Sequence, residues 1–349
     1  MVKARQSISG SSDKMRCLGL DAWTQGAISH ELNSMDPASG VEIARYDFFK
    51  TTSGRWMISE INNDVPSGFN EASFVGEIAR DFWPDKSRYE VPASITDNFV
   101  NELKRKNLKS LAMLYGTAYS EDLQICLFLK DHLEGASLKV TLASPSHLTV
   151  SGGKAAVWGQ AVDGIYRVYP VEWFSALHNR DAWMRAVSLK NLLLVNPLST
   201  IISQSKNFFS ILDAVGSDLF CDGDWDWVRP FIPHTSAFEP EKISAYAGEK
   251  DRWVLKPIFG RMGYDVAIGK LLTADNWQKA LSAASKKPEL YCIQECFDIA
   301  PVSFALGGCY PCVGVFVING RFSGYFTRAS LTPLTTYEAM DVATAVALS

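Results

Sequence analysis

Four polar side chains with complementary chemistry gather in the segment 43–62. Arg45 and Asp47 lie two residues apart in one run of aromatic and β-branched residues, and Glu60 and Asn62 lie two residues apart in the next. Carboxylate and carboxamide oxygens are hard ligands that Mg²⁺ prefers, and bound Mg²⁺ often carries the phosphates of a nucleotide. A guanidinium group holds a carboxylate or a phosphate through two parallel hydrogen bonds. These residue types therefore indicate a metal site with an anion-binding arginine beside it.

A β-hairpin is the element that would bring these side chains together. The polar residues 51–54 end in glycine and separate two strand-like runs, which is typical of a hairpin loop. If these residues form the loop, Arg45 lies opposite Glu60, and Asp47 lies opposite Ile58. Side chains alternate between the faces of a strand, so the polar residues share one face, and an odd-numbered loop would break this parity. The alternative is a solvated hairpin face that carries one ion pair, between Arg45 and Glu60.

A turn-rich polar run continues from the second strand of this hairpin. The motifs read, in order, Arg45-Tyr46-Asp47, Glu60-Ile61-Asn62-Asn63-Asp64-Val65-Pro66 and Glu71-Ala72. This series resembles the signature of the glutathionylspermidine synthase group of ATP-grasp ligases. In that family the aspartate, glutamate and asparagine at these positions bind Mg²⁺, and the arginine helps to hold the reacting carboxyl group. The resemblance implies metal-binding roles for Asp47, Glu60 and Asn62, and a catalytic role for Arg45.

Two lysines in the second half of the chain stand beside segments that could bind phosphate. Lys206 follows a polar turn and begins an amphipathic helix, and Lys256 is the single charge of the strand-like run 253–257. Gly260-Arg261-Met262-Gly263 follows that strand. Glycine backbones approach an anion closely and a lysine adds positive charge, so this arrangement is one way to hold phosphates. It is not a Walker A sequence; the alternatives are a surface lysine at 206 and a structural turn at 260–263.

Two further segments have polar residues at or near strand ends. The strand-like run 291–295 ends in Gln294 and Glu295. The segment 312–328 predicts a second hairpin with an Asn-Gly turn, and Arg328 lies at the far end of its returning strand. The plain alternatives are a strand that meets solvent at 294–295 and an edge-strand charge at 328.

The order of these motifs also resembles that of ATP-grasp enzymes. The resemblance implies that Lys206 and Lys256 contact ATP phosphates and that a mobile loop with Gly260, Arg261 and Gly263 covers them. It further implies that Gln294 and Glu295 form the hinge that meets adenine and ribose, and that Arg328 pairs with Arg45 around the acyl phosphate. The family often has an acidic residue after this last arginine. Ala329 and Ser330 follow here, which puts the contacts at that end in doubt.

Between the two groups of motifs, the hydrophobic pattern predicts a Rossmann-like lobe. A buried strand at 110–115, a helix from Ser120 and a strand at 138–143 form one β-α-β unit, which implies parallel strands and a right-handed crossover. The loop 116–120 either holds a substrate or simply connects the two elements. Further strands are expected at 155–158 and 164–169, helices at 22–32, 71–83 and 93–106, a disordered arm at 1–15 and a turn at 35–40.

Composition limits the class of protein. The chain has 349 residues, 47% of them hydrophobic, so it can bury the cores of about two domains. Its 34 basic and 38 acidic residues give a net charge of −4, which argues against a nucleic-acid binder with a basic patch. No run of 18 apolar residues occurs, so no membrane span is expected. Residues 1–15 lack the apolar core of a signal peptide, and a cytoplasmic protein is expected.

Cys309 and Cys312 form a C-x-x-C motif. A redox or zinc site would need a helix directly after the motif or a second pair of ligands. A strand-like run, 313–318, follows instead. Buried or incidental cysteines are therefore the favoured interpretation, and a metal or redox site is the alternative.

The motifs together predict an α/β (α+β) protein with an ATP-grasp fold. Because the metal ligands precede the phosphate-binding lysines, the order resembles the circularly permuted arrangement of glutathionylspermidine and eukaryotic glutathione synthetases. Residues 41–75 are expected to join the C-terminal half in one antiparallel sheet, with ATP between two sheets. The expected parts are an N-terminal arm with a short helix (1–40), a metal-binding hairpin (41–75), a Rossmann-like, pre-ATP-grasp substrate lobe (76–195) and the nucleotide-binding half (196–349).

The implied activity is ATP-dependent formation of an amide bond through an acyl phosphate. The implied substrates are a small carboxylate, such as an amino acid or peptide, and an amine, with ATP and two Mg²⁺ ions as cofactors. No nucleic-acid or membrane partner is expected, and a homodimer is an assembly that the sequence leaves open. The alternative is a non-catalytic ATP-binding protein with a regulatory or scaffolding role.

Overall fold

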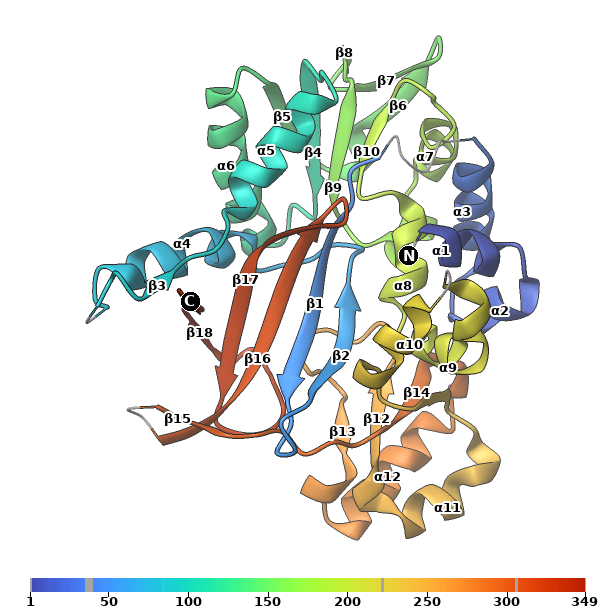
Figure 1. Ribbon diagram of the computed structural model, residues 1–349. Helices are drawn as coiled ribbons and strands as arrows, with labels where there is room; N and C mark the ends of the chain where they lie inside the picture. The colour runs from blue at the N-terminus through green and yellow to red at the C-terminus, as the bar shows by residue number, and fades with distance from the viewer. Residues whose placement is uncertain (1, 35–39, 84, 221–222, 305–306, 349) are drawn as a thin grey trace.

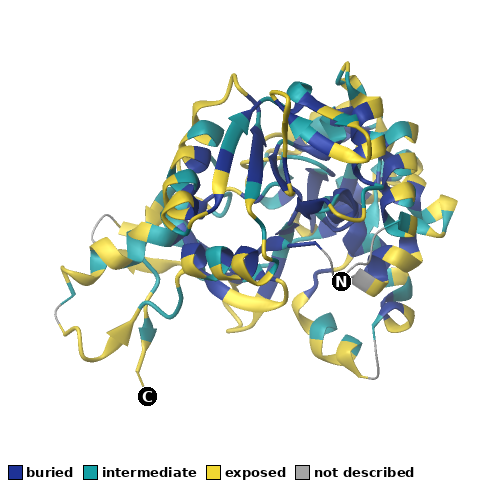
Figure 2. Ribbon diagram, turned by 90° about the horizontal axis from the view of Figure 1, so that it is seen from above, coloured by how far each residue is buried: buried dark blue, intermediate teal, exposed yellow. Residues whose placement is uncertain are grey.

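Three sheets, stacked along the length of the molecule, form the body of the protein in the computed structural model (Figure 1). The structure describes residues 2–34, 40–83, 85–220, 223–304 and 307–348. A central antiparallel sheet lies between a parallel sheet at one end and a smaller antiparallel sheet at the other. Figure 2 shows that buried residues fill the interior, whereas the short strands near the C-terminus consist of intermediate and exposed residues.

The central sheet joins two segments that are far apart in the sequence. Its order is β18-β17-β16-β1-β2. The strands are β1 (Ile43–Lys50), β2 (Trp56–Asn62), β16 (Gly307–Ile318), β17 (Arg321–Ser330) and β18 (Met340–Val342), with β15 (Val302–Phe304) paired to β16. All of these pairings are antiparallel. The predicted union of the N-terminal hairpin with the C-terminal hairpin in one sheet is therefore confirmed.

The smaller sheet is also antiparallel and has the order β11-β14-β12-β13. Its strands are β11 (Thr235–Ala237), β14 (Tyr291–Glu295), β12 (Trp253–Pro257) and β13 (Ala267–Ile268), and its helices are α11 (Ile243–Gly248) and α12 (Ala274–Ala284). On one face Leu255 and Ile293 pack with Trp277 and Leu281 of α12. The other face carries Lys256, whose contact with Ser59 of β2 turns it toward the central sheet.

The parallel sheet has the order β10-β9-β4-β5 and confirms the predicted β-α-β unit. Its strands are β4 (Ser110–Tyr115), β5 (Lys139–Ala143), β9 (Gly164–Val168) and β10 (Leu193–Val195). Around it lie α4 (Phe69–Arg80), α5 (Ile95–Arg105), α6 (Ser120–Gly135) and α7 (Arg180–Ala186). Short strands β6 (Leu148–Ser151), β7 (Lys154–Val157) and β8 (Gln160–Ala161) form a small separate sheet, and β3 (Tyr89–Glu90) pairs with β19 (Val346–Ala347).

The expectation of a disordered arm at residues 1–15 is wrong. This segment forms α1 (Val2–Ser9) and α2 (Ser12–Cys17), and α3 (Ala22–Ser34) matches the predicted helix. Ala4, Ile8 and Met15 are buried in the cluster that also contains Phe208 of the later helix α9. The serine-rich composition suggested flexibility, but packing of these few apolar side chains against distant residues orders the segment.

The remaining helices connect the lobes. They include α8 (Ile201–Gln204), α9 (Asn207–Leu219), α10 (Asp224–Val228) and, among several 3₁₀ helices, one at Val171–Ala176. The turn expected at 35–40 lies, apart from Gly40, outside the described residues. Within the described ranges, no helix combines the length and the apolar character that crossing a bilayer requires.

Candidate active site

The hairpin of β1 and β2 forms, but its register differs from the predicted one. Lys50 pairs with Trp56, so the loop comprises the five residues 51–55. An odd loop would place Glu60 on the wrong face, yet Asp47 lies opposite Glu60, because Ser59 is an extra, unpaired residue between two ladder positions. This β-bulge restores the parity. The predicted sharing of one face is thus correct. The predicted oppositions of Arg45 with Glu60 and of Asp47 with Ile58 are wrong, because Arg45 lies opposite Asn62 and Asp47 lies opposite Glu60.

Asp47 is the centre of a buried charge cluster. Arg45 donates to both of its carboxylate oxygens, from Nε to Oδ1 at 2.7 Å and from Nη2 to Oδ2 at 3.0 Å. Arg328 donates from Nη2 to the same Oδ2 at 2.7 Å. The Asp47 side chain is only 1% exposed. Despite burial, the neighbouring charges of Asp47 and Glu60 raise the pKa of Arg328 above its ordinary value. The sequence analysis expected Arg45 and Arg328 to lie together. The structure shows that both bind the Asp47 carboxylate, which lies between them.

Phe326 and Gly314 make room for this cluster. The guanidinium carbons of Arg45 and Arg328 lie 5.3 and 5.2 Å from the centroid of the Phe326 ring, which is within cation–π range. Gly314 lies opposite Asp47 on one side and opposite Phe326 on the other. A Cβ at Gly314 would come within 2.6 Å of the Phe326 carbonyl oxygen and 2.9 Å of Arg45 Cδ. Only glycine therefore leaves space for the arginine, a requirement that the sequence did not reveal.

Glu60 and Asn62 continue the polar face beside Asp47. Asn62 Nδ2 lies 3.2 Å from Asp47 Oδ2 and 3.2 Å from Glu60 Oε1, so the two carboxylates converge on one point. Glu60 also pairs with Lys206 at 3.2 Å. Burial alone would raise the pKa of Glu60, but Lys206 and the other nearby cations outweigh it and hold that pKa well below the ordinary value. The carboxylate is therefore ionised and available to a cation at neutral pH.

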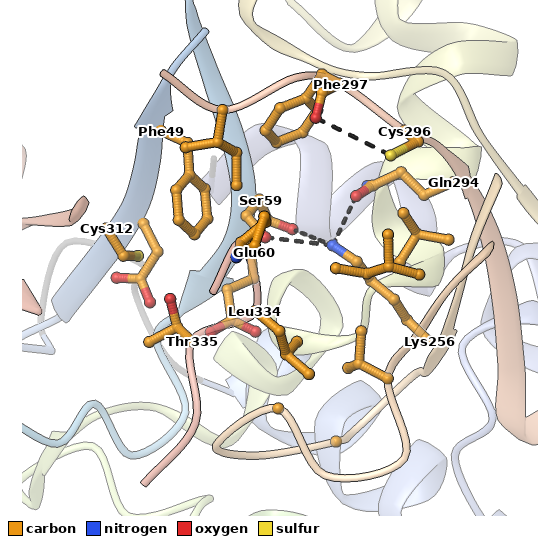
Figure 3. A pocket seen from close by; sticks show the side chains of 18 of the residues that line it. Phe49, Ser59, Glu60, Lys256, Gln294, Cys296, Phe297, Cys312, Leu334 and Thr335 are labelled. Atoms are coloured by element: carbon orange, nitrogen blue, oxygen red, sulfur yellow. Dashed lines mark hydrogen bonds between the residues drawn. The ribbon is translucent and has the colours of Figure 1, made fainter. Parts of the chain in front are cut away.

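Lys256 reaches the same region from the smaller sheet. Its Nζ donates to Gln294 Oε1 at 2.6 Å and to Ser59 Oγ at 3.2 Å, as Figure 3 shows. Burial, together with the positive charge of Lys206, lowers the pKa of Lys256 to about 8. The bulge at Ser59 thus has a second consequence, because it turns the hydroxyl of this residue toward the lysine. The role of Ser59 was missed, since a bulge leaves no local sequence signal here.

A cavity between the central and the smaller sheet contains most of these groups. Its empty space, including the part open to solvent, is about 840 Å³. Charged or polar side chains line one part of it, namely Asp47, Glu60, Lys206, Lys256, Gln294 and Arg328. Apolar side chains line another part, including Phe49, Val254, Ile268, Phe297, Ile299 and Leu334. Arg45 is not among the lining residues and lies behind Asp47.

The Gly-x-x-Gly loop forms a wall of this cavity. Gly260, Met262 and Gly263 line it, and Lys206 Nζ donates to the Gly260 carbonyl at 2.9 Å. Gly263 has a φ of +72°, and a Cβ there would come within 2.5 Å of the Thr335 carbonyl oxygen. Glycine is therefore required at 263 both for its backbone conformation and for the close approach of a second loop. Arg261 instead points away from the cavity.

Glu295 also lies away from the cavity. Alternation along β14 places Gln294 on the face of Lys256 and Glu295 on the opposite face, where it pairs with Arg252 at 3.5 Å. The Gln294 amide donates to Thr235 Oγ1 at 3.0 Å while its oxygen accepts from Lys256. Of the predicted hinge pair, the structure brings only the glutamine side chain to the site.

A buried polar network fixes the hairpin of β1 and β2 to the parallel sheet. Asn196, directly after β10, exchanges hydrogen bonds with the backbone of Ile43 at 2.6 and 2.8 Å. Arg167 of β9 is fully buried and pairs with Asp64 at 2.6 Å. Asp64 in turn accepts from the Val171 amide at 3.1 Å. These residues hold the strand ends that carry the site, and sequence reasoning quoted Asp64 without finding this role.

The cysteines of the C-x-x-C motif are buried and lie on strand β16. Cys312 lines the cavity and lies 3.7 Å from Arg328 Nη2. Burial raises the pKa of Cys312 to about 12, so the thiol is protonated at neutral pH. Among the described residues, no cluster of three or more His, Cys, Asp or Glu side chains has the geometry of a metal site. The burial of both cysteines agrees with the favoured interpretation of the sequence.

Comparison with known proteins identifies relatives of this fold. Residues 1–347 match the family described as "Glutathionylspermidine synthase preATP-grasp". A glutathione synthetase-like effector (GSS30) from Globodera pallida has a similar structure, with a TM-score of 0.65 and 12% identity over 98% of this chain and 83% of that chain. D-cycloserine synthetase DcsG aligns with a TM-score of 0.41 and 15% identity over 67% of this chain and 75% of that chain, and no conclusion rests on it. No curated protein sequence gives a significant match.

Proposed function

The chain belongs to the glutathionylspermidine synthase pre-ATP-grasp family, and on that premise we propose that it is an ATP-dependent ligase that joins a small carboxylate to an amine. One observation carries the proposal: an ionised carboxylate, two lysines and an arginine from four separate segments converge in one cavity. These residues are Glu60, Lys206, Lys256 and Arg328. A cavity with this charge pattern suits a polyphosphate and its metal ion far better than a neutral ligand.

The two parts of the cavity suggest how ATP lies in it. The apolar part, with Val254, Ile268 and Phe297, would accept the adenine ring between the two sheets. The cationic part, with Lys206 and Lys256, would neutralise the phosphates, and the glycine loop would cover them. Gln294 fixes the position of Lys256 and would keep the ammonium group directed at the phosphates. This arrangement assigns no nucleotide contact to the side chains of Arg261 and Glu295.

The residues of the hairpin fit Mg²⁺. Asp47 and Glu60 converge on a point that the Asn62 amide nitrogen now approaches at 3.2 Å from each carboxylate. A half-turn of that amide would direct its oxygen to the same point and complete a set of hard oxygen ligands. Bound there, Mg²⁺ would neutralise charge on the phosphates and orient them. Asp47, Glu60 and Asn62 are therefore the residues that we assign to the metal.

In the reaction that we propose, the carboxylate oxygen of the substrate attacks the γ-phosphorus of ATP, which gives an acyl phosphate and ADP. The amine nitrogen then attacks the acyl carbon, phosphate leaves, and the amide forms. Arg328 faces the cavity and would stabilise the negative oxygen of the second step. Arg45 holds Asp47 from behind and is a positioning residue, because it does not line the cavity. The glycine loop would keep water away from the acyl phosphate.

Release of ADP tests this proposal. Wild-type protein with Mg-ATP would be assayed against pairs of amino acids or small peptides with amino acids or polyamines. We expect ADP release that depends on both substrates and an amide product detected by mass spectrometry. Glu60→Gln should abolish this turnover, whereas Glu134→Gln, which alters an exposed carboxylate paired with Lys130, should not change it.

The outcomes separate the alternatives. ADP release without an amide product would favour simple carboxylate phosphorylation. Binding of Mg-ATP in calorimetry without turnover on any pair would favour a non-catalytic nucleotide-binding protein. Absence of Mg-ATP binding would refute the proposed function, because the charged cavity would then have no nucleotide to hold.

A further inference from the structure

Arg261 leaves the nucleotide cavity and reaches across to the lobe that carries the parallel sheet. Its guanidinium group forms an ion pair with Glu172 and lies 5.2 Å from the centroid of the Trp173 ring. The residues on either side of it, Gly260 and Met262, line the cavity. We infer that Arg261 is a latch, a positioning residue that holds the glycine loop closed through Glu172 and Trp173. This inference rests on the proposed function for its effect on nucleotide binding.

The receiving side of the latch is a rigid platform. The Trp173 ring stacks on Tyr119 at a centroid distance of 6.1 Å and meets the edge of Tyr169 at 5.4 Å. The two residues before Trp173 are also fixed. The Val171 amide donates a hydrogen bond to the Asp64 carboxylate at 3.1 Å, and Glu172 lies in the 3₁₀ helix 171–176. Aromatic packing with two neighbours fixes the Trp173 ring. The cation–π contact with Arg261 therefore does not have to offset the loss of conformational entropy of this ring.

The platform is linked to the metal hairpin. Asp64 follows β2 by two residues and pairs with the fully buried Arg167 at 2.6 Å. The Val171 amide and the Arg167 guanidinium thus bind the two oxygens of one carboxylate. A loop that is latched to Glu172 and Trp173 is therefore placed relative to Glu60 and Asn62, and not only relative to its own sheet. This link gives the latch a means of aligning phosphates with the metal ligands.

The loop itself has little structure that would hold it in place. Its backbone hydrogen bonds are local turns, such as Tyr264 N to Arg261 O at 3.0 Å and Val266 N to Gly263 O at 3.2 Å. Met262 and Tyr264 are 52% and 72% exposed. Segments with local hydrogen bonds and few buried contacts open at low free-energy cost. Lys206 holds the start of the loop through the Gly260 carbonyl at 2.9 Å, and the side chain of Arg261 adds the contacts that tie the loop to the lobe of the parallel sheet.

The test compares Arg261→Ala, Glu172→Gln and the double variant, with Arg105→Ala as control. Arg105 also forms an ion pair, with Glu102 on α5, but far from the loop. The first measurement is the rate of chymotrypsin cleavage after Tyr264 without nucleotide. The second is the dissociation rate of a fluorescent ATP analogue with Mg²⁺. Thermal unfolding by circular dichroism verifies that every variant is folded.

If Arg261 is a latch, chymotrypsin should cleave both single variants about 3- to 10-fold faster than wild type, and both should release the nucleotide faster by a similar factor. The double variant should be no faster than Arg261→Ala in either measurement. KM for ATP should rise more than kcat falls, and Arg261→Lys should recover part of the loss. Equal cleavage rates in wild type, single variants and control would overturn the latch. If wild type binds no nucleotide, the proposed function fails, but the cleavage rates still decide the latch.

Discussion

Asp47 and Glu60 lie directly opposite each other on strands β1 and β2, and their carboxylates converge on the Asn62 amide nitrogen, 3.2 Å from each. They have different partners. Asp47 is enclosed by two guanidinium groups, whereas Glu60 is partly exposed and faces the ammonium group of Lys206. The proposed metal site would thus combine a structural carboxylate with one that is free to exchange partners. Five predictions concern this cluster and its surroundings.

Asp47→Asn should destabilise the protein more than Glu60→Gln does. Loss of the Asp47 charge leaves Arg45 and Arg328 buried side by side without an anion, which should cost about 3–5 kcal/mol. Glu60→Gln should cost less than this, because its side chain is 24% exposed and solvent screens part of its attraction to Lys206. Urea unfolding followed by tryptophan fluorescence measures both values. Equal losses would show that Asp47 does not hold the arginine pair.

Gly314→Ala should disturb the arginine cluster. The new methyl group would lie 2.6 Å from the Phe326 carbonyl oxygen and 2.9 Å from Arg45 Cδ. Either the strand or the arginine side chain must therefore shift, which should lower the free energy of unfolding by about 1–3 kcal/mol. Gly26→Ala is the matched control: this exposed glycine of α3 has no atom within 4 Å of the added Cβ, and the change should stabilise the helix by up to about 1 kcal/mol. Chemical unfolding of both variants, with Mg-ATP calorimetry for Gly314→Ala, gives the comparison.

Nucleotide affinity should fall as the pH rises through about 8. The pKa of Lys256 is lowered from 10.5 to about 8, chiefly by burial, so the free protein loses this proton near pH 8. Phosphates favour the ammonium form, so binding takes up a proton and weakens by at most about tenfold per pH unit above 8. Titration calorimetry at pH 7, 8 and 9 measures this slope. Lys256→Met should bind more weakly, and a pH slope that persists in this variant would refute the assignment.

The same pKa shift has an opposite effect on the stability of the free protein. Between pH 8 and 10.5 the unfolded chain carries a proton on Lys256 that the folded chain has lost. The contribution of this residue to the free energy of unfolding therefore rises with pH across that window. Lys256→Met should remove this rise, which unfolding at pH 8 and pH 10 measures.

Asn62→Asp should make the stability of the protein depend on Mg²⁺. A third carboxylate beside Asp47 and Glu60 adds repulsion in the absence of metal and one more anionic ligand in its presence. The melting temperature without Mg²⁺ should fall below that of wild type, and millimolar MgCl₂ should raise it more than it raises the wild-type value. Asn63→Asp serves as a neighbouring control, since Asn63 bonds Ser203 at 2.6 Å and Glu42 at 3.3 Å, but neither Asp47 nor Glu60. Equal Mg²⁺ responses in the two variants would argue against a metal site at Asn62.

Much of the fold followed from local patterns. The hairpins, the β-α-β unit and the strand that carries Lys256 were predictable, because alternation, turn chemistry and apolar runs depend on neighbouring residues. The order of the motifs implied the permuted ATP-grasp arrangement, and the joining of β1 and β2 to β16 and β17 confirms that relation. Residues that face the cavity on a predicted strand, such as Asp47 and Lys256, were found for the same reason.

Other features depended on contacts between distant segments. The serine-rich N-terminus is helical because Ile8 and Met15 find a core made by later residues. Arg261 turns from the cavity because Glu172 offers a partner from another lobe. No sequence window contains both members of these pairs.

The hairpin of β1 and β2 separates what the sequence determined from what the tertiary structure decided. The sequence alone determined that Arg45, Asp47, Glu60 and Asn62 stand on paired strands, since side-chain alternation is a property of the strand itself. Only the tertiary structure decided that they share a face: the loop has an odd length, and the unpaired Ser59 corrects the register. That bulge brings the hydroxyl and carbonyl of Ser59 to Lys256 of the other sheet, at 3.2 and 3.4 Å. The pairing of the two strands follows from their own sequences, whereas the register of that pairing depends on the elements against which the sheet packs.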